Sequence, residues 1–427
     1  MSIRFDQNHQ ARAARLMRRG QARRTIASPL AARITEARVV CMATPRGAPG
    51  SPPRDPAAMR PGGIGKEPRT MEFSMDTLGW TPAWAQAFAS ATGDGRDGLL
   101  PGRVAREDRD LYQVFTNRGE LVARLSGRLR HAARERAALP AVGDWTALAL
   151  ARDGALARIQ TVLARKSCFS RKAVFGGGPA GGAGKTAEQV LAANVDFAFL
   201  VSGLDEDFNP RRIERYLAIA WDSGARPVIV LNKSDLCGDL GAKRMAIERS
   251  SAGVPIHAVS ATSGAGMEDL APYLCPGWTV VFLGSSGVGK SSLINRLLGE
   301  ERQRTRGVRE FDGRGRHVTT ARQMFVLSGG ALLIDTPGLR EIQPWEVEEG
   351  VGTVFDDIAA LAEDCRFRDC RHLSEPGCAV KQAVAEGRLD EGRLSNYLRL
   401  QREEAALAVR RSLRARMVID RRGKHLR

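Results

Sequence analysis

The hydrophobic pattern divides the chain into stretches with no apolar period and stretches in which apolar runs recur regularly. Residues 1–70 are of the first kind and are rich in Arg, Pro, Gly and Ala. Such a composition buries too little apolar surface to fold alone, so we predict a disordered basic extension. An organelle transit peptide and an RNA-binding arm are alternatives. Because Met71 and Met75 offer later starts, we favour a start site assigned too early.

Short alternating apolar runs follow over residues 78–172, with Gly, Pro or Asp between them. They read LYQVFT, ELVARLSGRL, DWTALAL and ARIQTVLA, and several short strands at close spacing predict a small β-barrel. Residues 173–190, AVFGGGPAGGAGKTAEQV, are typical of a flexible Gly-rich linker. This linker ends like a phosphate loop at Gly184, but Pro179 stands where the first glycine is needed and no strand precedes it, so we exclude that motif.

From residue 191 to 343, buried strand patterns alternate with helical ones. The strand patterns are FAFLVSG, PVIVLNK, VPIHAVS, TVVFLG, QMFVL and ALLIDTPG, and the clearest helices are RRIERYLAIAWDSG and SSLINRLLG. This alternation predicts a mainly parallel α/β sheet. Residues 344–427 are helical, interrupted by a cysteine cluster, and end in the basic run VRRSLRARMVIDRRGKHLR. A chain of 427 residues exceeds one hydrophobic core, so we predict several domains.

Charge and cysteine usage narrow the functional classes. The formal net charge is +17, and the first 70 residues hold 14 Lys and Arg against 4 Asp and Glu. This excess favours an anionic partner, nucleic acid before membrane, with a solvated charged surface as the alternative. No run approaches the roughly 18–20 apolar residues of a membrane-spanning helix. Three of the seven cysteines lie within residues 365–378, which indicates a metal site in a reducing cytoplasm.

The segment GSSGVGKSS matches the phosphate-loop pattern between the apolar run TVVFL and the helix-like SSLINRLL. Its glycines let backbone N–H groups wrap close to phosphates. Lys290 supplies positive charge to the β- and γ-phosphates, and Ser291 offers an oxygen to Mg²⁺. The predicted phosphate-binding residues are Gly284, Ser285, Ser286, Gly287, Val288, Gly289, Lys290, Ser291 and Ser292.

The segment LNKSDL indicates recognition of a guanine base. The carboxylate of Asp235 only accepts hydrogen bonds, so it can pair with guanine N1 and N2 but not with adenine. The later SAT, at the end of another strand, suits a backbone contact to guanine O6, although alone it would be an ordinary turn. These two motifs predict GTP as the substrate, with base-binding residues Asn232, Lys233, Ser234, Asp235, Ser260 and Ala261.

Two further segments complete a GTPase site. In LLIDTPG, Asp335 can reach the Mg²⁺ shell and Gly338 can present its N–H to the γ-phosphate. In GRGRHVTT, Thr319 and Thr320 are both candidates for the switch threonine that ligates the metal, and we favour Thr319. Alone, DTPG would be a turn and the threonines surface residues. After a phosphate loop at these distances, they predict Mg²⁺ ligation by Ser291, Thr319 and Asp335.

The water-activating residue is not the usual one. Small GTPases place a glutamine soon after the DxxG glycine, but Leu339 follows Gly338 here. An apolar side chain has no group that can orient water, so His317 becomes the candidate. A surface histidine in a Gly-rich loop is the alternative. The predicted catalytic residues are therefore His317, Lys290 and Thr319.

The cysteine cluster has the spacing of a structural zinc site. Cys365, Cys370, His372 and Cys378 form a C-x4-C-x-H-x5-C set. Three thiolates and one imidazole match a closed tetrahedral Zn²⁺ site, with buried free cysteines as the alternative. Three arginines interleave with these ligands, and we expect them and the basic tail to contact RNA phosphates, with solvated charge as the alternative for the tail. They are Arg366, Arg368 and Arg371.

The motifs follow the order NKSD, SAT, phosphate loop, switch threonine and DTPG, which is a circular permutation of the usual GTPase order. Permutation at an exposed loop leaves the core contacts intact, so the same sheet can form. With a barrel before it and a cysteine cluster after it, this set resembles the bacterial ribosome small subunit-dependent GTPase A family over about residues 78–400. That family's switch usually reads His-Thr-Thr-Thr, and Val318 replaces the first threonine here.

The resemblance implies a multi-domain protein with an OB-fold barrel at 78–172, a circularly permuted GTPase domain at 191–343 and a zinc-binding helical domain at 344–427. It implies GTP hydrolysis stimulated by the small ribosomal subunit during late maturation of that subunit, with His317 as the catalytic histidine. The expected partners are the small subunit with its rRNA, and GTP or GDP, for a cytoplasmic monomer without a membrane role. A phosphate-loop small-molecule kinase is the alternative, although NKSD and SAT would have no use there.

Overall fold

The computed structural model describes residues 73–93, 98–108, 110–133, 135–151, 156–175, 185–251, 253–299, 322–335 and 348–405. The predicted basic extension at 1–70 and the basic tail lie outside these residues. None of the helices within the described ranges is long and apolar enough to cross a membrane.

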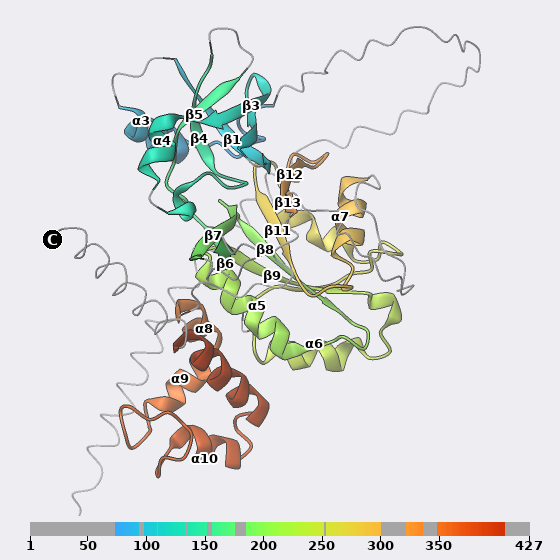
Figure 1. Ribbon diagram of the computed structural model, residues 1–427. Helices are drawn as coiled ribbons and strands as arrows, with labels where there is room; N and C mark the ends of the chain where they lie inside the picture. The colour runs from blue at the N-terminus through green and yellow to red at the C-terminus, as the bar shows by residue number, and fades with distance from the viewer. Residues whose placement is uncertain are drawn as a thin grey trace, which may run out of the picture. The chain divides into compact units, whose positions relative to one another are not determined.

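A five-stranded barrel forms the N-terminal part of the described chain, as predicted (Figure 1). Its strand order is β1-β2-β3-β5-β4, and β4 pairs back onto β1 to close it. β3 and β5 are parallel, whereas the other neighbours are antiparallel. Fully buried apolar side chains such as Val104, Val114 and Ile159 fill it. The strands are β1 Leu99–Asp108, β2 Leu111–Thr116, β3 Gly119–Leu125, β4 Trp145–Ala149 and β5 Ala157–Val162.

Three helices accompany the barrel. α3 (Pro82–Thr92) begins with proline at its first position, and the Thr81 hydroxyl accepts the Trp84 N–H as its N-cap. α4 (Gly127–Ala132) and the 3₁₀ helix η1 (Arg136–Ala138) lie between β3 and β4 in the chain. The hydrophobic pattern did not predict β1, because its centre holds a charged residue, Arg103, that is buried.

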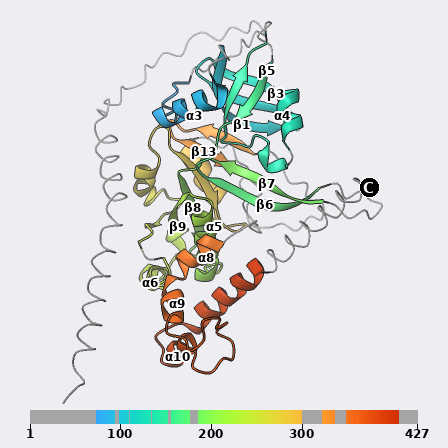
Figure 2. The same cartoon turned by 90° about the vertical axis from the view of Figure 1, so that its left-hand side faces the viewer.

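The prediction of a flexible linker over residues 173–190 is wrong at both ends of that range, where the structure has strands. β6 (Cys168–Phe175) and β7 (Lys185–Ala193) form an antiparallel two-stranded sheet, which Figure 2 shows as two strands running side by side. Apolar residues at the end of the second strand, Leu191 and Ala192, are fully buried in the main core. This burial provides the stabilisation that the Gly-rich composition concealed. The expectation that no strand precedes this segment is wrong, because β6 does. Lys185 begins a strand instead of the helix that follows a phosphate loop, so the exclusion of that motif still holds.

The central α/β sheet is confirmed, with strand order β10-β9-β8-β11-β13-β12. All neighbours are parallel except β12, which runs antiparallel to β13. Successive residues of β8 point to opposite faces of the sheet, so that Phe199 and Leu200 lie in separate apolar cores. This is the pattern of a sheet buried on both faces. The elements are β8 Phe197–Gly203, α5 Pro210–Asp222, β9 Arg226–Asn232, η2 Ser234–Leu236, α6 Leu240–Glu248, β10 Ile256–Ala258, η3 Met267–Tyr273, β11 Thr279–Leu283, α7 Lys290–Leu298, β12 Gln323–Val326 and β13 Leu332–Asp335.

The C-terminal segment, residues 348–405, is helical as predicted. It contains α8 (Glu348–Val354), α9 (Asp356–Ala362), α10 (Ala379–Ala385) and a helix over residues 391–405. Buried apolar residues of this segment, including Phe355, belong to the same core cluster as α5. The segment is therefore packed against the α/β sheet's helices.

Candidate nucleotide site

The predicted nucleotide motifs lie at the carboxyl ends of the parallel strands. NKSD begins at the end of β9, SAT follows β10, the phosphate loop follows β11, and DTPG begins at the end of β13. In open α/β sheets, ligands bind outside this edge. The strand order thus gathers motifs that are more than 100 residues apart in the chain.

The phosphate loop connects β11 to α7. A Cβ atom at Gly284 would lie 2.5 Å from the Val201 carbonyl oxygen. Gly289 has φ +92°, and a Cβ there would lie 2.2 Å from Asn232 Nδ2. Side chains are therefore excluded at both ends of the loop. Lys290 is buried, and its ammonium donates to the carbonyl oxygens of Gly284 at 2.6 Å and Ser285 at 2.5 Å, so its charge lies inside the loop.

Asn232 joins three of the motifs. Its side-chain amide donates to the Val288 carbonyl oxygen in the phosphate loop at 2.8 Å. Its side-chain oxygen accepts the backbone N–H of Ala261 in the SAT loop at 3.0 Å. Only 2% of Asn232 is exposed, so these bonds have no competition from water. The side chain that begins the base motif thereby fixes the phosphate loop and the SAT loop in register.

Replacing Asn232 with alanine should lower the affinities for GTP and GDP alike, by about tenfold to a hundredfold. The change leaves a buried carbonyl and a buried N–H without their partner, and both nucleotides depend on the same loops. Fluorescence titration with each nucleotide measures the effect. Asn117→Ala, in the exposed β2–β3 turn, is the control. An unchanged affinity in Asn232→Ala would contradict the bridging role.

The base motif leaves its carboxylate accessible. Lys233 takes a left-handed backbone with φ 64°, and its ammonium pairs with Asp205 Oδ2 at 2.5 Å. The next residues turn in η2, where Asp235 is exposed. The adjacent loop is ordered by Ser260, which is fully buried and whose hydroxyl accepts the Ser263 N–H at 3.1 Å. An acceptor-only group beside a fixed backbone loop suits guanine.

The described metal-binding candidates are oxygen donors, which suit Mg²⁺. Ser291 lies in the first turn of α7, and Asp335 ends β13, the strand beside β11. Ser292 follows in the same turn. The remaining predicted residues of the switch and catalytic machinery lie outside the described residues. They are His317, Thr319, Thr320 and Gly338.

Three residues at this site lie outside the predicted motifs and were not predicted. Asp205 and Asp207 follow the end of β8, and Arg212 lies in the first turn of α5. Arg212 Nη1 donates to the Ser285 hydroxyl of the phosphate loop at 2.7 Å. Charged residues directly after a buried parallel strand are the signal that could have identified them.

The predicted zinc ligands come together. Their ligand atoms all lie within 4.8 Å of one another. Cys365 Sγ lies 3.9 Å from Cys378 Sγ, and His372 Nδ1 lies 3.4 Å from Cys378 Sγ. Tetrahedral Zn²⁺ requires separations of about 3.8 Å between sulfurs and about 3.5 Å between sulfur and nitrogen. The cluster, completed by Cys370, is compatible with a structural zinc site.

The loop that carries these ligands is held by backbone contacts. The Glu375 carboxylate accepts N–H groups of Arg371, Leu373 and Ser374 at 2.9–3.0 Å. Hydrogen bonds from its own N–H and from these neighbours lower the pKa of Glu375 to about 2. The carboxylate therefore remains charged at neutral pH and keeps the loop closed around His372, which takes φ 60°.

A parallel sheet with a phosphate loop at its centre and a guanine motif two strands away defines a GTPase. The motif order along the chain makes it a circularly permuted one.

Comparisons with known proteins identify the family. The family model described as RsgA GTPase matches residues 162–345. A protein of Opitutus terrae named small ribosomal subunit biogenesis GTPase RsgA is 49% identical over 348 residues, which are 79% of this chain and 92% of that protein. A protein of Lactiplantibacillus plantarum, named small ribosomal subunit biogenesis GTPase RsgA 2, is 47% identical over 307 residues, which are 72% of this chain and 84% of that protein. The chain therefore belongs to the RsgA GTPase family and is a GTP hydrolase.

Solved structures agree with this fold. The crystal structure of YjeQ from Thermotoga maritima matches with a TM-score of 0.51 and 26% identity, covering 72% of this chain and 99% of that one. The structure of YloQ, described as a circularly permuted GTPase, matches with a TM-score of 0.50 and 23% identity, and the match covers 74% of this chain and 98% of that one. The predicted permutation is thereby confirmed. The alternative of a small-molecule kinase is not supported.

Proposed function

We propose that this protein hydrolyses GTP during late maturation of the small ribosomal subunit, and that the subunit stimulates hydrolysis. The observation that carries the proposal is the Asn232 link between the base motif and the phosphate loop, in a chain of the RsgA family. The names of the relatives refer to small ribosomal subunit biogenesis, which supports the ribosomal role. We propose a cytoplasmic monomer.

The domain assignments extend this proposal. The barrel's strand order, with β1 closing onto β4 and β3 parallel to β5, supports an OB-fold that contacts rRNA. The domain bounds are those of the sequence: 78–172 for the barrel, 191–343 for the GTPase domain and 344–427 for the zinc domain. Zn²⁺ on the cysteine cluster would brace three exposed arginines for phosphate contacts. They are Arg366, Arg368 and Arg371.

In the proposed mechanism, this chain's residues position GTP and water. Lys290 supplies charge to the β- and γ-phosphates from within the loop, and Asp235 selects guanine. Ser291 and Asp335, with Thr319, would hold Mg²⁺, which neutralises charge on the phosphate oxygens. His317 would orient the attacking water, because Leu339 has no polar group for that role.

Phosphate release with and without purified small ribosomal subunits tests the proposal. Subunits should raise turnover strongly, and His317→Ala should lower the stimulated rate by about 10²–10⁴-fold without changing GTP affinity. His131→Ala, an exposed histidine of α4, is the control. Turnover that ignores the subunit would contradict the proposal, and phosphate transferred to a metabolite instead of water would restore the kinase alternative.

A further inference from the structure

Helix α5 contacts the phosphate loop at its first turn. Arg212 Nη1 donates to Asp207 Oδ2 at 2.6 Å and to the Ser285 hydroxyl at 2.7 Å. The Ser285 hydroxyl in turn donates to Asp207 Oδ2 at 2.8 Å, which closes a triangle. The Arg212 hydrogen bond, followed by that of Ser285, lowers the pKa of Asp207. The triangle therefore keeps its charges at neutral pH and ties the helix to the loop.

A different stripe of the same helix faces the C-terminal segment. Its members are spaced three and four residues apart, so they share one side of the helix. Arg215 pairs with Glu403 at 3.2 Å, and a Cβ at Gly350 would lie 2.0 Å from the Ala218 carbonyl oxygen. The stripe consists of Arg211, Glu214, Arg215 and Ala218.

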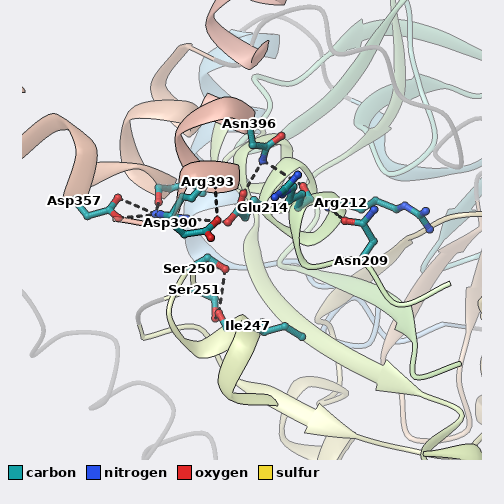
Figure 3. A network of polar contacts seen from close by, with 12 residues as sticks. Asn209, Arg212, Glu214, Ile247, Ser250, Ser251, Asp357, Asp390, Arg393 and Asn396 are labelled. Carbon is teal, nitrogen blue, oxygen red and sulfur yellow. Dashed lines mark hydrogen bonds and ion pairs between the residues drawn. The ribbon is translucent and has the colours of Figure 1, made fainter. Parts of the chain in front are cut away.

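The centre of this contact is a buried ionic network (Figure 3). Glu214 accepts from Arg393 Nη1 at 2.9 Å and from Asn396 Nδ2 at 2.6 Å. Arg393 also bonds both carboxylate oxygens of Asp357 at 2.8 Å and the Val354 carbonyl oxygen at 2.7 Å. Glu214 and Arg393 are only 4% and 9% exposed. Separating such a pair leaves uncompensated buried charge, so separating the helix from the segment is energetically costly.

We propose that helix α5 couples the phosphate loop to the C-terminal segment, with Arg212 and Glu214 as positioning residues on its two sides. Residues two apart are rotated by about 200° around a helix, so each faces a different neighbour. A displacement at Ser285 is transmitted to Arg393, and by linkage an event at the segment alters the loop's nucleotide preference. This inference rests on the proposed function, because the loop must bind GTP and GDP for the coupling to act.

The test uses Arg393→Met in the full-length protein and measures equilibrium affinities for GTP and GDP. The ratio of the two affinities should change by about threefold to thirtyfold. Arg402→Met is the matched control, because this exposed arginine of the same helix bonds its own helix at the Leu398 carbonyl oxygen. The control should leave the ratio unchanged.

Glu214→Gln is the second variant, because it removes the charge and keeps the shape if Arg393→Met loses its fold. Zinc content and thermal unfolding identify the folded variants. Combining either variant with Arg212→Lys should give non-additive effects on the ratio, which a separate structural role for each residue would not. If the folded variants keep the ratio of GTP to GDP affinity unchanged, or if the combined substitutions change it additively, the proposed coupling is wrong but the proposed function stands. Failure of the unsubstituted protein to bind guanine nucleotides would overturn the proposed function instead.

Discussion

Cys370→Ser should remove zinc from the protein and unfold the C-terminal segment locally while the α/β sheet remains folded. Structural Zn²⁺ contributes about 10–16 kcal/mol of binding free energy to small domains. The α10 helix starts at the ligand Cys378, whose Sγ accepts the Lys381 N–H, and the connecting loop has few buried apolar residues. Cys370 is the better target because it lies outside any helix cap, so its loss affects the metal alone.

Two measurements check this result: zinc content by mass spectrometry, and hydrogen exchange along the chain. Exchange should rise across residues 365–385 and stay low in the central strands. Cys168→Ser is the control, since this thiol lies on β6, outside the cluster, and burial raises its pKa to about 11. Stoichiometric zinc in Cys370→Ser, or none in the unsubstituted protein, would exclude the assignment.

The sequence was sufficient to predict an element or a candidate site wherever the local pattern of residues determined it. FAFLVSG and TVVFLG are continuous apolar runs, and they became the adjacent buried strands β8 and β11. The cysteine spacing likewise identified four candidate ligands, whose ligand atoms lie within 4.8 Å of one another. In these cases the local pattern and the tertiary environment impose the same requirement.

The rest depended on long-range contacts. β7 was hidden in a Gly-rich stretch, because its burial comes from residues elsewhere in the core. Glu214 and Arg393 are 179 residues apart and look like surface charges in a helical pattern. Period and composition describe the face that a residue presents, but not the partner that the fold brings to it. The network on α5 was therefore visible only in three dimensions.

The C-terminal segment has two connections to the nucleotide site, and the permutation accounts for the first of them. Along the chain it follows β13 and DTPG, the segment expected to respond to the γ-phosphate. In space it packs against α5, which touches the loop at Ser285. A segment held at both places can respond to the nucleotide without any contact with it.

Arg103→Met should destabilise the barrel and its junction with the GTPase sheet by about 3–5 kcal/mol. The Arg103 side chain of β1 is 2% exposed and lies over the Trp145 ring. Its guanidinium donates to carbonyl oxygens of three separate segments and to the Thr279 hydroxyl at 2.7 Å, at the start of the strand that leads to the phosphate loop. Those carbonyls belong to Leu78, Gly143 and Asn194.

Burial lowers the pKa of Arg103 to about 10, while Asp196 and Asp144 act in the opposite direction, so the side chain is charged at neutral pH. Methionine fills a similar volume but removes the Arg103 donor from four buried acceptors, of which the Gly143 carbonyl oxygen still accepts from Asn194 Nδ2 at 3.0 Å. Urea unfolding followed by tryptophan fluorescence reports the loss, because Trp80 and Trp84 pack near Trp145 in the barrel. Arg158→Met, an exposed arginine of β5, should have little effect. Equal stability of the two variants would show that the four acceptors do not need this charge.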